Sequence, residues 1–496
     1  MRLNLDTNSM DDYARFIKIK GLPQFGFQGR TAIIPDEYAD QLGVVASTRS
    51  TGSYTPIECA FDYQRGITAM AIRKRRFAVF ADCGLGKTLM ILEFARYCKR
   101  AIGKRKHVLI VSPLMVVPQT IGENDEFYGD DTKLEQVHAS ELSARLKSKA
   151  GGILITNYDA LKNDTPQGNI GALILDESSM LKSHYGAWAQ DCLRLGAGIE
   201  WKLACTGTPA PNDRIEYANH AVFLGAFPTV NAFLARYFVN RGQTDNRWEL
   251  KPHALRPFYR SLSHWCIFLT NPATYGWKNN CQTIPPIHIH VDRVGLTDEQ
   301  TELAYDQTSS LFADRIGGIT SRSVLGQIAK GSHKGKDIDT LKPAFIRRLV
   351  ESWPTESTII WCKYNAEQDL IASTFPDAAN ISGSTPHDKR LELVADFKAR
   401  RRLVLISKPR ILGFGLNLQV ATRQVFSGLQ DSYEEFYQAV KRSNRIGSTK
   451  PLNVHIPVTD IERPMIETVL RKADRVQHDT EEQEQLFKEC GYDITS

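Results

Sequence analysis

A lysine that follows a glycine loop gives the clearest chemical signal in this sequence. Residues 80–88 read FADCGLGKT. The stretch from Ala81 to Thr88 has the spacing A-x-x-x-x-G-K-T, which is the Walker A pattern with alanine in its first position. In such a loop the backbone N–H groups cradle phosphates, the lysine reaches the β- and γ-phosphates, and the threonine hydroxyl binds Mg²⁺. The residues that are predicted to hold ATP here are Gly84, Leu85, Gly86, Lys87 and Thr88.

Two adjacent acids end an apolar run further along the chain. The run reads ALILDE at 172–177, so Asp176 and Glu177 follow a strand-like segment directly. A carboxylate at the carboxyl end of a strand is where a Walker B aspartate holds Mg²⁺, and Asp176 is therefore the predicted metal ligand beside Thr88. Glu177 is then placed to orient or deprotonate the attacking water. Together with Lys87, these acids predict hydrolysis of ATP.

Two arginines near the C-terminus fit the stabilisation of charge in the same reaction. Within residues 431–448, Ser432 and Glu435 have the S-x-x-E spacing of a capping box, and Gly447 fits the end of the helix that would follow. The residues at i, i+4 and i+7 on one face of that expected helix are Gln438, Arg442 and Arg445. Arginines that project from one face have the geometry of arginine fingers. The alternative is a basic helix on the surface.

Short apolar runs recur along the chain and are typical of buried parallel strands. In the first half they are FAVFA at 77–81, VLIV at 108–111, ILIT at 153–156, ALILDE at 172–177 and KLACT at 202–206. In the second half they are TIIWC at 358–362, LVLIS at 403–407, QVFS at 424–427 and VHIPV at 454–458. Helical stretches separate these runs. The alternation predicts two α/β domains, of which only the first carries a phosphate loop.

Taken in order, these motifs resemble the superfamily-two helicase engine, and most specifically its Swi/Snf-type ATPase branch. The resemblance covers about residues 56–460. The matching segments are FDYQRG (61–66), DCGLGKT (82–88), VSPLMVVPQT (111–120), ITNYDAL (155–161), DESS (176–179), TGTPAPN (206–212), IIWCKYNAEQDLI (359–371), ISGSTPHDKRLELVADF (381–397), GFGLNLQ (413–419) and QAVKRSNRIG (438–447). They correspond to motifs Q, I, Ia, the segment after Ia, II, III, IV, the segment after IV, V and VI.

The resemblance implies two tandem RecA-like P-loop NTPase domains with parallel sheets and helical insertions. It implies ATP and Mg²⁺ as cofactors, Gln64 as the reader of adenine, and Gly415 as a further residue of the nucleotide site. The residues that it places on nucleic acid, or in coupling, are Pro113, Asn157, Thr206, Thr208, Lys363, Thr385, Asn417 and Gln438.

Three departures point to one part of this family. Motif II reads DESS without the fourth-position histidine of many relatives, motif III has Pro211 where glutamine is common, and motif V opens SKPRILGFG. The DESS motif, this opening and the compact length resemble the small helicases of bacteriophages and prophages more than chromatin remodellers.

The expected domain organisation follows from the motif order. It comprises an N-terminal extension (1–55), a first RecA-like domain (56–280) with a helical insertion at about 213–280, a bridging helical segment (281–340), a second RecA-like domain (341–460) and a helical tail (461–496). The aromatic-rich insertion fits a helical core better than a nucleic-acid surface. We expect a helix within 294–307 and a basic loop at 325–337.

The resemblance implies a nucleic-acid-dependent ATPase that couples hydrolysis to translocation on DNA, because Swi/Snf-type enzymes usually track along duplexes without separating them. Two alternatives remain open. One is a strand-separating helicase on DNA or RNA, and the other is an ATP-switched nucleic-acid-binding motor subunit that needs a protein partner. The choice of DNA over RNA rests on the resemblance alone.

Composition limits the classes of protein that the sequence can encode but does not identify a function. The net charge of +6 favours an anionic partner only weakly, and each basic cluster taken singly fits a solvated surface better than a phosphate contact. No two cysteines form a Cys-x-x-Cys pair, and His288 and His290 alternate as in an ordinary strand, so no zinc site is predicted. No apolar run reaches the roughly 18 residues of a membrane span, and the first residues lack the pattern of a signal peptide. We expect a cytoplasmic protein of a bacterial or phage-infected cell.

Overall fold

The computed structural model describes most of the chain and divides it into two compact units. The described residues are 1–22, 25–34, 38–44, 53–162, 168–183, 186–242, 248–278, 284–309, 319–412, 416–428, 432–445 and 447–489. The first unit comprises residues 1–280 and 476–496, and the second comprises residues 281–475. Each unit is built around one parallel sheet, as the apolar runs predict.

The first unit contains a seven-stranded sheet in the order β12-β4-β9-β8-β5-β7-β6, with every neighbouring pair parallel. The strands are β4 (Arg76–Ala81), β5 (His107–Ser112), β6 (Leu134–Gln136), β7 (Ile153–Asn157), β8 (Ile170–Asp176), β9 (Trp201–Thr206) and β12 (Cys266–Leu269). The five apolar runs of the first half all form strands here. Because the sheet is parallel, the carboxyl ends of β4, β8 and β9 meet at one edge, which brings the phosphate loop and the acids together.

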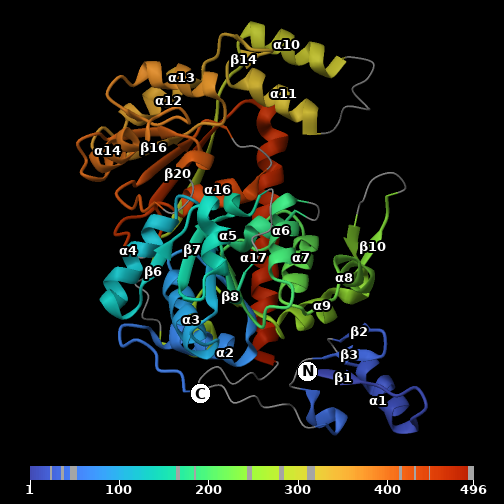
Figure 1. The fold of residues 1–496 in the computed structure, drawn as a ribbon. Helices are drawn as coiled ribbons and strands as arrows, with labels where there is room; N and C mark the ends of the chain where they lie inside the picture. Colours follow the sequence, from blue (N-terminus) through green and yellow to red (C-terminus); the bar gives the residue numbers. More distant parts are fainter. Residues whose placement is uncertain are drawn as a thin grey trace. The chain divides into compact units, whose positions relative to one another are not determined.

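Helices cover both faces of this sheet. They are α2 (Asp62–Lys74), α3 (Lys87–Ala101), α4 (Val117–Tyr128), α5 (Ala139–Lys147) and α6 (Ala187–Leu195). Helix α3 follows the phosphate loop as predicted, packs on β5, β8 and β9, and lies beside α2 (Figure 1). Alternate strand residues, such as Phe80 and Leu173, point to the face opposite α3 and join a large apolar cluster with α5 and α6.

The aromatic-rich insertion belongs to the same apolar cluster. It comprises α7 (Tyr217–Phe223), α8 (Val230–Tyr237), β10 (Phe238–Asn240), β11 (Trp248–Leu250) and α9 (Leu255–Leu262). Phe258 is fully buried, and its ring contacts those of Tyr217, Phe233, Tyr237 and other neighbours edge-on. The prediction of a helical core is confirmed, because most of these aromatic rings are buried against one another rather than presented to a ligand.

The first residues of the chain fold into a small module of their own. Strands β1 (Arg2–Asn4), β3 (Thr31–Ile33) and β2 (Gly26–Gln28) form an antiparallel sheet beside α1 (Met10–Lys20), with a separate apolar core. The guanidinium of Arg236 in α8 donates to the carbonyls of Leu22 and Phe25 and lies 4.1 Å from the Phe25 ring centroid. Backbone carbonyls and a ring therefore attach the module to the insertion.

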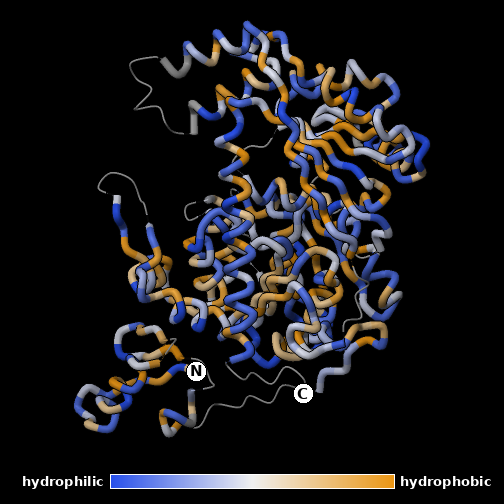
Figure 2. Tube along the Cα trace, turned by 180° about the vertical axis from the view of Figure 1, so that it is seen from behind, coloured by the Kyte–Doolittle hydropathy of each residue, from blue (hydrophilic) through white to orange (hydrophobic). Residues whose placement is uncertain are grey.

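The second unit contains a six-stranded parallel sheet in the order β13-β20-β19-β16-β18-β17. Its strands are β13 (Ile287–Arg293), β16 (Thr358–Trp361), β17 (Ala379–Asn380), β18 (Val404–Ser407), β19 (Arg423–Phe426) and β20 (Leu452–Val458). Its helices include α12 (Lys342–Glu351), α13 (Asn365–Thr374), α14 (His387–Lys398), α15 (Pro409–Leu412) and α16 (Tyr433–Val440). The central strands are strongly apolar (Figure 2), and all four predicted strands of this half are present.

The segment before α12 differs from the expected basic loop. Helix α10 (Asp298–Ser309) confirms the predicted helical entry, but α11 (Ile319–Ala329) and a hairpin of β14 (Ser332–His333) and β15 (Lys336–Asp337) occupy the remainder. Lys334 and Gly335 have φ of 49° and 78°, which suits a two-residue hairpin turn. The prediction of a basic loop at 325–337 is wrong, because the end of α11 and the β14–β15 hairpin occupy these residues.

A buried ion cluster anchors this segment inside the second unit. Glu462 binds Lys330 through Oε1 at 2.7 Å and Lys342 through Oε2 at 2.6 Å, and all three side chains are buried. Burial alone would raise the pKa of Glu462, but the two lysines together lower it to about 2. Lys330 is therefore structural and is not exposed to bind phosphates.

The C-terminal helix α17 (Arg463–Glu489) contributes residues to both units. In the first unit, Asp479 pairs with Arg214, and Glu484 accepts from the hydroxyl of Thr270 at 2.6 Å. The expected helical tail is thus a packed part of the fold.

A lysine buried in β9 makes the stability of the first unit depend on pH. Lys202 Nζ donates to the carbonyl of Phe223 at 2.7 Å, and burial, with a smaller effect of Arg76, lowers the pKa of Lys202 to about 7. A lysine in an unfolded chain titrates near pH 10.4. Between these values the unfolded chain binds more protons than the folded chain, so stability rises with pH.

We therefore expect the melting temperature of the first unit to rise between about pH 7 and pH 9 by a few degrees through this group. Lys202→Met should flatten that rise, whereas Lys104→Met, which changes an exposed lysine, should leave it unchanged. Differential scanning calorimetry at several pH values measures the difference. An equal rise in the Lys202→Met variant would show that another group carries the pH dependence.

Candidate ATP site

The phosphate loop connects β4 to α3 at the carboxyl edge of the first sheet. Gly84 and Gly86 have φ of 89° and 70°, in the left-handed region that favours glycine. Lys87 opens α3, and its Nζ donates to the carbonyls of Ala81 at 2.8 Å and Asp82 at 3.2 Å. The amino end of α3, with Thr88 in its first turn, therefore presents N–H groups, a cation and a hydroxyl where phosphates are predicted to bind.

Gln64 lies directly against this loop. Its side chain is buried, with Oε1 accepting from the N–H of Phe61 at 2.9 Å and Nε2 lying 3.4 Å from the carbonyl of Leu85. A Cβ on Gly86 would lie 2.1 Å from Gln64 Nε2, which shows how closely this amide approaches the loop. The contact joins α2 to the phosphate loop, and reading of adenine by Gln64 stays a prediction.

The two acids occupy the end of β8 as predicted. Asp176 accepts from the Ser112 hydroxyl at 2.9 Å and from the N–H of Glu177 at 2.9 Å. Burial, followed by the charge of Glu177, raises the pKa of Asp176 to about 6. The carboxyl group of Asp176 therefore resists ionisation. A divalent cation bound beside it would favour its charged form. Because Mg²⁺ commonly takes one or two carboxylates together with nucleotide phosphates, Asp176 and Thr88 fit its binding.

Glu177 is held in an unusual backbone conformation. Its φ and ψ are 49° and 53°, a left-handed conformation that costs a residue with a side chain about 1–2 kcal/mol. Its Oε1 accepts from Thr206 Oγ1 at 2.6 Å and from Ser179 Oγ at 3.0 Å. Motifs II and III are therefore joined by a direct hydrogen bond. The role of Ser179 was not predicted, although a hydroxyl two residues after the acid is visible in the DESS motif.

Other predicted coupling residues lie at the same edge. Thr208 is buried, and its N–H donates to Thr206 Oγ1 at 3.1 Å. Pro113 follows β5 and begins the turn into α4, since its carbonyl accepts from the N–H of Val116. Asn157 ends β7, and its Oδ1 accepts from the N–H of Ala160 at 3.1 Å. These contacts explain the local turns, and the roles of these residues toward nucleic acid stay predictions.

In the second unit, the expected helix carrying the two arginines is shorter than predicted. Ser432 caps α16 by accepting from the N–H of Glu435, as expected, but the helix ends at Val440. Arg442 and Arg445 lie in the turns that follow, so the prediction that they share a helix face with Gln438 is wrong. Beyond Val440 the chain forms turns that bond to distant segments: Arg442 O accepts from Leu418 N, and Asn444 Nδ2 donates to Pro285 O.

The acid of the expected capping box has other partners. Glu435 accepts from Arg410 Nε at 2.7 Å and from Lys363 Nζ at 3.1 Å. Although burial opposes it, these two cations hold the pKa of Glu435 below its ordinary value. Lys363 follows β16 and Arg410 lies in α15, so two carboxyl strand ends and the start of α16 meet here. Arg410 was not predicted, because SKPRILGFG departs from the usual opening of motif V.

The remaining predicted residues of this unit lie in different settings. Thr385 Oγ1 accepts from the N–H of Ser382 at 2.9 Å, and the exposed Asn417 donates to Gln419 Oε1 at 3.0 Å. Gln438 is buried in α16 beside Glu434. Gly415 lies outside the described residues.

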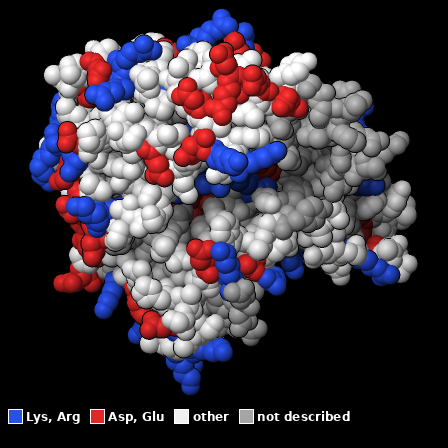
Figure 3. Space-filling view, turned by 90° about the horizontal axis from the view of Figure 1, so that it is seen from above, with Lys and Arg blue, Asp and Glu red and all other residues white. Residues whose placement is uncertain are grey.

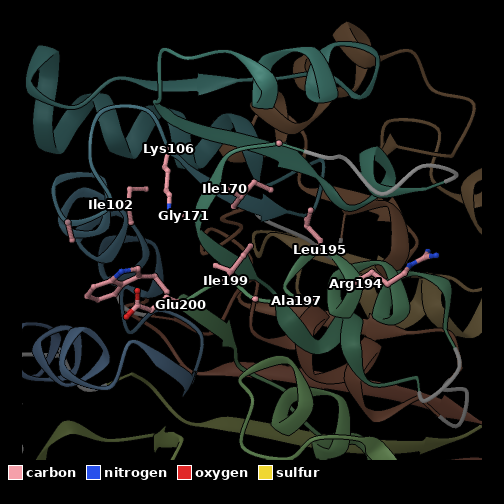
Figure 4. A pocket seen from close by; sticks show the side chains of 13 residues that line it. Ile102, Lys106, Ile170, Gly171, Arg194, Leu195, Ala197, Ile199 and Glu200 are labelled. Atoms are coloured by element: carbon pink, nitrogen blue, oxygen red, sulfur yellow. The ribbon is translucent and has the colours of Figure 1, made fainter. Parts of the chain in front are cut away.

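Neither the charge on the face drawn in Figure 3 nor the groove drawn in Figure 4 points to the site. On the face shown in Figure 3, basic and acidic side chains lie among one another. A groove of about 990 Å³ is lined by Lys106, Ile170, Glu200 and others (Figure 4). Ile170 opens β8 and Trp201, also in the lining, opens β9, so the groove lies at the amino edge of the sheet, opposite the phosphate loop.

A phosphate loop, a strand-end acid pair and two parallel sheets define a P-loop NTPase with tandem RecA-like domains. Residues 67–323 match the SNF2-related domain, and residues 341–447 match the helicase conserved C-terminal domain. The first match covers 257 of the 496 residues (323 − 67 + 1), and the chain belongs to the SNF2-related family. The predicted resemblance to the Swi/Snf-type branch is confirmed.

Individual relatives agree with this assignment. The DNA annealing helicase and endonuclease ZRANB3 of Bos taurus is 23% identical over 420 residues, covering 79% of this chain and 37% of the relative. Protein p41 of Acyrthosiphon pisum secondary endosymbiont phage 1 is 24% identical over 440 residues, covering 79% of this chain and 91% of the phage protein. The chain thus spans about two fifths of the cattle relative and nearly all of the phage protein.

A solved structure is also similar. It is the Sulfolobus solfataricus SWI2/SNF2 ATPase core in complex with dsDNA, with 19% identity and a TM-score of 0.41 over 85% of this chain and 93% of that chain.

Among the described residues, no helix has the length and apolar character that crossing a membrane requires.

Proposed function

We propose that this protein is a nucleic-acid-dependent ATPase that couples ATP hydrolysis to translocation along duplex DNA. The observation that carries the proposal is the hydrogen bond of 2.6 Å between Thr206 of motif III and Glu177 of motif II. Motion along a polymer requires that the hydrolytic group respond to the state of the bound polymer. The hydrogen bond between Glu177 and Thr206 of motif III can transmit a change in motif III to the hydrolytic acid. The name of the cattle relative, a DNA annealing helicase, supports DNA as the polymer.

In the proposed reaction, the residues of the first unit bind ATP and activate water. Lys87 leaves its loop carbonyls for the β- and γ-phosphates, and the N–H groups at the start of α3 hold the phosphate oxygens. Mg²⁺, bound by Thr88 and Asp176, would neutralise phosphate charge. Glu177 orients the attacking water and accepts its proton. Arg442 and Arg445 of the second unit are the proposed stabilisers of charge on the transferring phosphoryl group.

Contacts to the nucleic-acid backbone are proposed for the cations around Glu435. Lys363 and Arg410 share one carboxylate, so the group carries one net positive charge that a phosphate can neutralise. Arg410 is largely exposed, which suits a contact with an external polymer. Such contacts are independent of sequence and weaken with salt. Coupling or nucleic-acid roles are proposed, on the resemblance to the family, for Pro113, Asn157, Thr208, Thr385, Asn417 and Gln438.

The test is steady-state ATP hydrolysis without nucleic acid and with duplex DNA, single-stranded DNA or RNA, with Lys87→Ala as the blank. We expect the largest stimulation with duplex DNA and its loss as salt rises. A strand-displacement assay should release no labelled strand. Stimulation by single strands or RNA alone, with strand release, would instead identify a strand-separating helicase. An absence of stimulation by every polymer would favour a motor subunit activated by a protein partner.

The proposed location is the cytoplasm of a bacterial or phage-infected cell. The support is the phage relative, 91% of which this chain covers. Fractionation of such a cell with an antibody to the chain tests it.

A further inference from the structure

A helix outside the recognised motifs forms hydrogen bonds to the motif II turn, which follows the hydrolytic acid Glu177. Helix α7 follows motif III, and its His220 Nε2 lies 3.0 Å from Ser178 Oγ, the residue after Glu177. Asn219, the preceding residue of α7, donates through Nδ2 to the carbonyls of Leu181 at 2.7 Å and Ser183 at 2.9 Å. Two adjacent side chains of α7 therefore bind both the start and the end of the motif II turn.

Burial makes these contacts strong constraints. Ser178, Asn219 and His220 are essentially fully buried. A buried polar group that loses its partner costs about 1–3 kcal/mol, so the turn cannot shift away from α7 freely. Burial also lowers the pKa of His220 to about 4, so the imidazole is neutral at neutral pH and serves as a fixed hydrogen-bonding group.

The turn that α7 contacts is the one that must hold Glu177 in its left-handed conformation. Glu177 precedes the short helical turn Ser178–Leu181, and its carboxylate accepts from Ser179 within that turn. A strained conformation persists only where its surroundings over-determine it. The contacts of α7 to Ser178 and Leu181 supply that restraint from one side, and Thr206 supplies it from the other.

Helix α7 is itself fixed to motif III and to the strand before the phosphate loop. Asn212, the last residue of motif III, donates to Glu216 from its N–H at 2.9 Å and its Nδ2 at 3.0 Å, and Glu216 precedes α7. The His220 ring meets Phe80 of β4 edge-on, with 5.3 Å between centroids. The helix thus connects motif III, motif II and the base of the phosphate loop.

We propose that Asn219 and His220 are positioning residues, which hold the motif II turn so that Glu177 faces the attacking water. The proposal rests on the proposed ATP hydrolysis, and it adds two residues that carry no part of the chemistry themselves. Their effect should fall on the rate of the bound complex, because their hydrogen bonds go to the motif II turn and not to the residues assigned to hold ATP. A misplacement of about 1 Å can reduce catalysis by about a hundredfold.

The kinetic test compares His220→Ala, Ser178→Ala and the double variant. We expect each single change to lower kcat by about tenfold or more with KM for ATP nearly unchanged, and the double variant to be no worse than the worse single variant. His220→Gln, whose amide can reach the same hydroxyl, should recover part of the loss. Additive losses, or a kcat within about twofold of wild type in both single variants, would overturn the proposal.

A second readout does not depend on turnover. Hydrogen–deuterium exchange of the backbone across 176–183 should quicken in His220→Ala and Ser178→Ala. The matched control is Val222→Ala, which trims a partly buried apolar side chain of the same helix and removes no hydrogen bond to motif II. Ser178→Ala removes only a hydroxyl, so it carries the test if His220→Ala loses stability. Unchanged exchange in both variants, or an equal increase in Val222→Ala, would contradict the positioning role.

The two readouts separate the two proposals. A wild-type protein that hydrolyses no ATP with any nucleic acid would contradict the proposed function. Quickened exchange across 176–183 in the variants would still support the restraint of the motif II turn by α7. Normal wild-type hydrolysis with unchanged exchange and kcat in the variants would contradict the positioning role alone.

Discussion

Replacing Glu177 with glutamine is expected to lower the kcat of ATP hydrolysis by about a hundredfold or more, because general-base catalysis typically contributes 10²–10⁴-fold. Glutamine keeps the shape of the side chain and an oxygen that can accept from Thr206 and Ser179. The strained turn should therefore stay folded. What is lost is the negative charge that draws a proton from the attacking water.

The measurement pairs steady-state hydrolysis with equilibrium binding of ATP. We expect the dissociation constant for ATP to stay within a few-fold of wild type, since Glu177 is not among the residues assigned to hold the nucleotide. Glu141→Gln, which changes an exposed acid on α5, is the matched control and should leave both quantities unchanged. If Glu177→Gln retained most of its turnover, another group would have to activate the water.

The position of the acid pair could be predicted from the sequence because parallel strands impose it. A β-strand that ends in Asp176-Glu177 and a β-strand that ends at the phosphate loop must present these groups at the same edge. The apolar runs identified the strands, and burial on both faces explains why those runs are nearly continuous. The pairing of Thr206 with Glu177 follows from the same geometry, since β9 lies between β4 and β8.

What the sequence did not predict depends on contacts between distant segments. The turn after Val440 looks helical by spacing, but the bond from Asn444 to the carbonyl of Pro285 has no local signature. Lys330 reads as a surface charge until Glu462, 132 residues later, is found beside it. His220 reads as one more residue of an amphipathic helix, and only the packing of α7 on the motif II turn gives it a role.

The prediction with the largest expected effect concerns Arg445. Arginine fingers are worth about 10³–10⁵ in rate, so Arg445→Ala should nearly abolish turnover. The local geometry favours Arg445 for this role, because it is half-buried and, within the described residues, its guanidinium has no hydrogen-bond or ion-pair partner. A guanidinium without an internal partner can bind a phosphoryl oxygen without first breaking a bond.

The binding of ATP should survive this substitution, because the predicted nucleotide contacts of the first unit are unaltered. Arg445→Lys should recover little, since an ammonium keeps the charge but not the planar fork that matches two phosphoryl oxygens. Arg348→Ala, on the exposed face of α12, controls for the loss of one arginine from the same unit. Near-normal turnover in Arg445→Ala with loss in Arg442→Ala would assign the finger to Arg442. Near-normal turnover in both would mean that charge on the transferring group is stabilised from the first unit alone, by Lys87 and the metal.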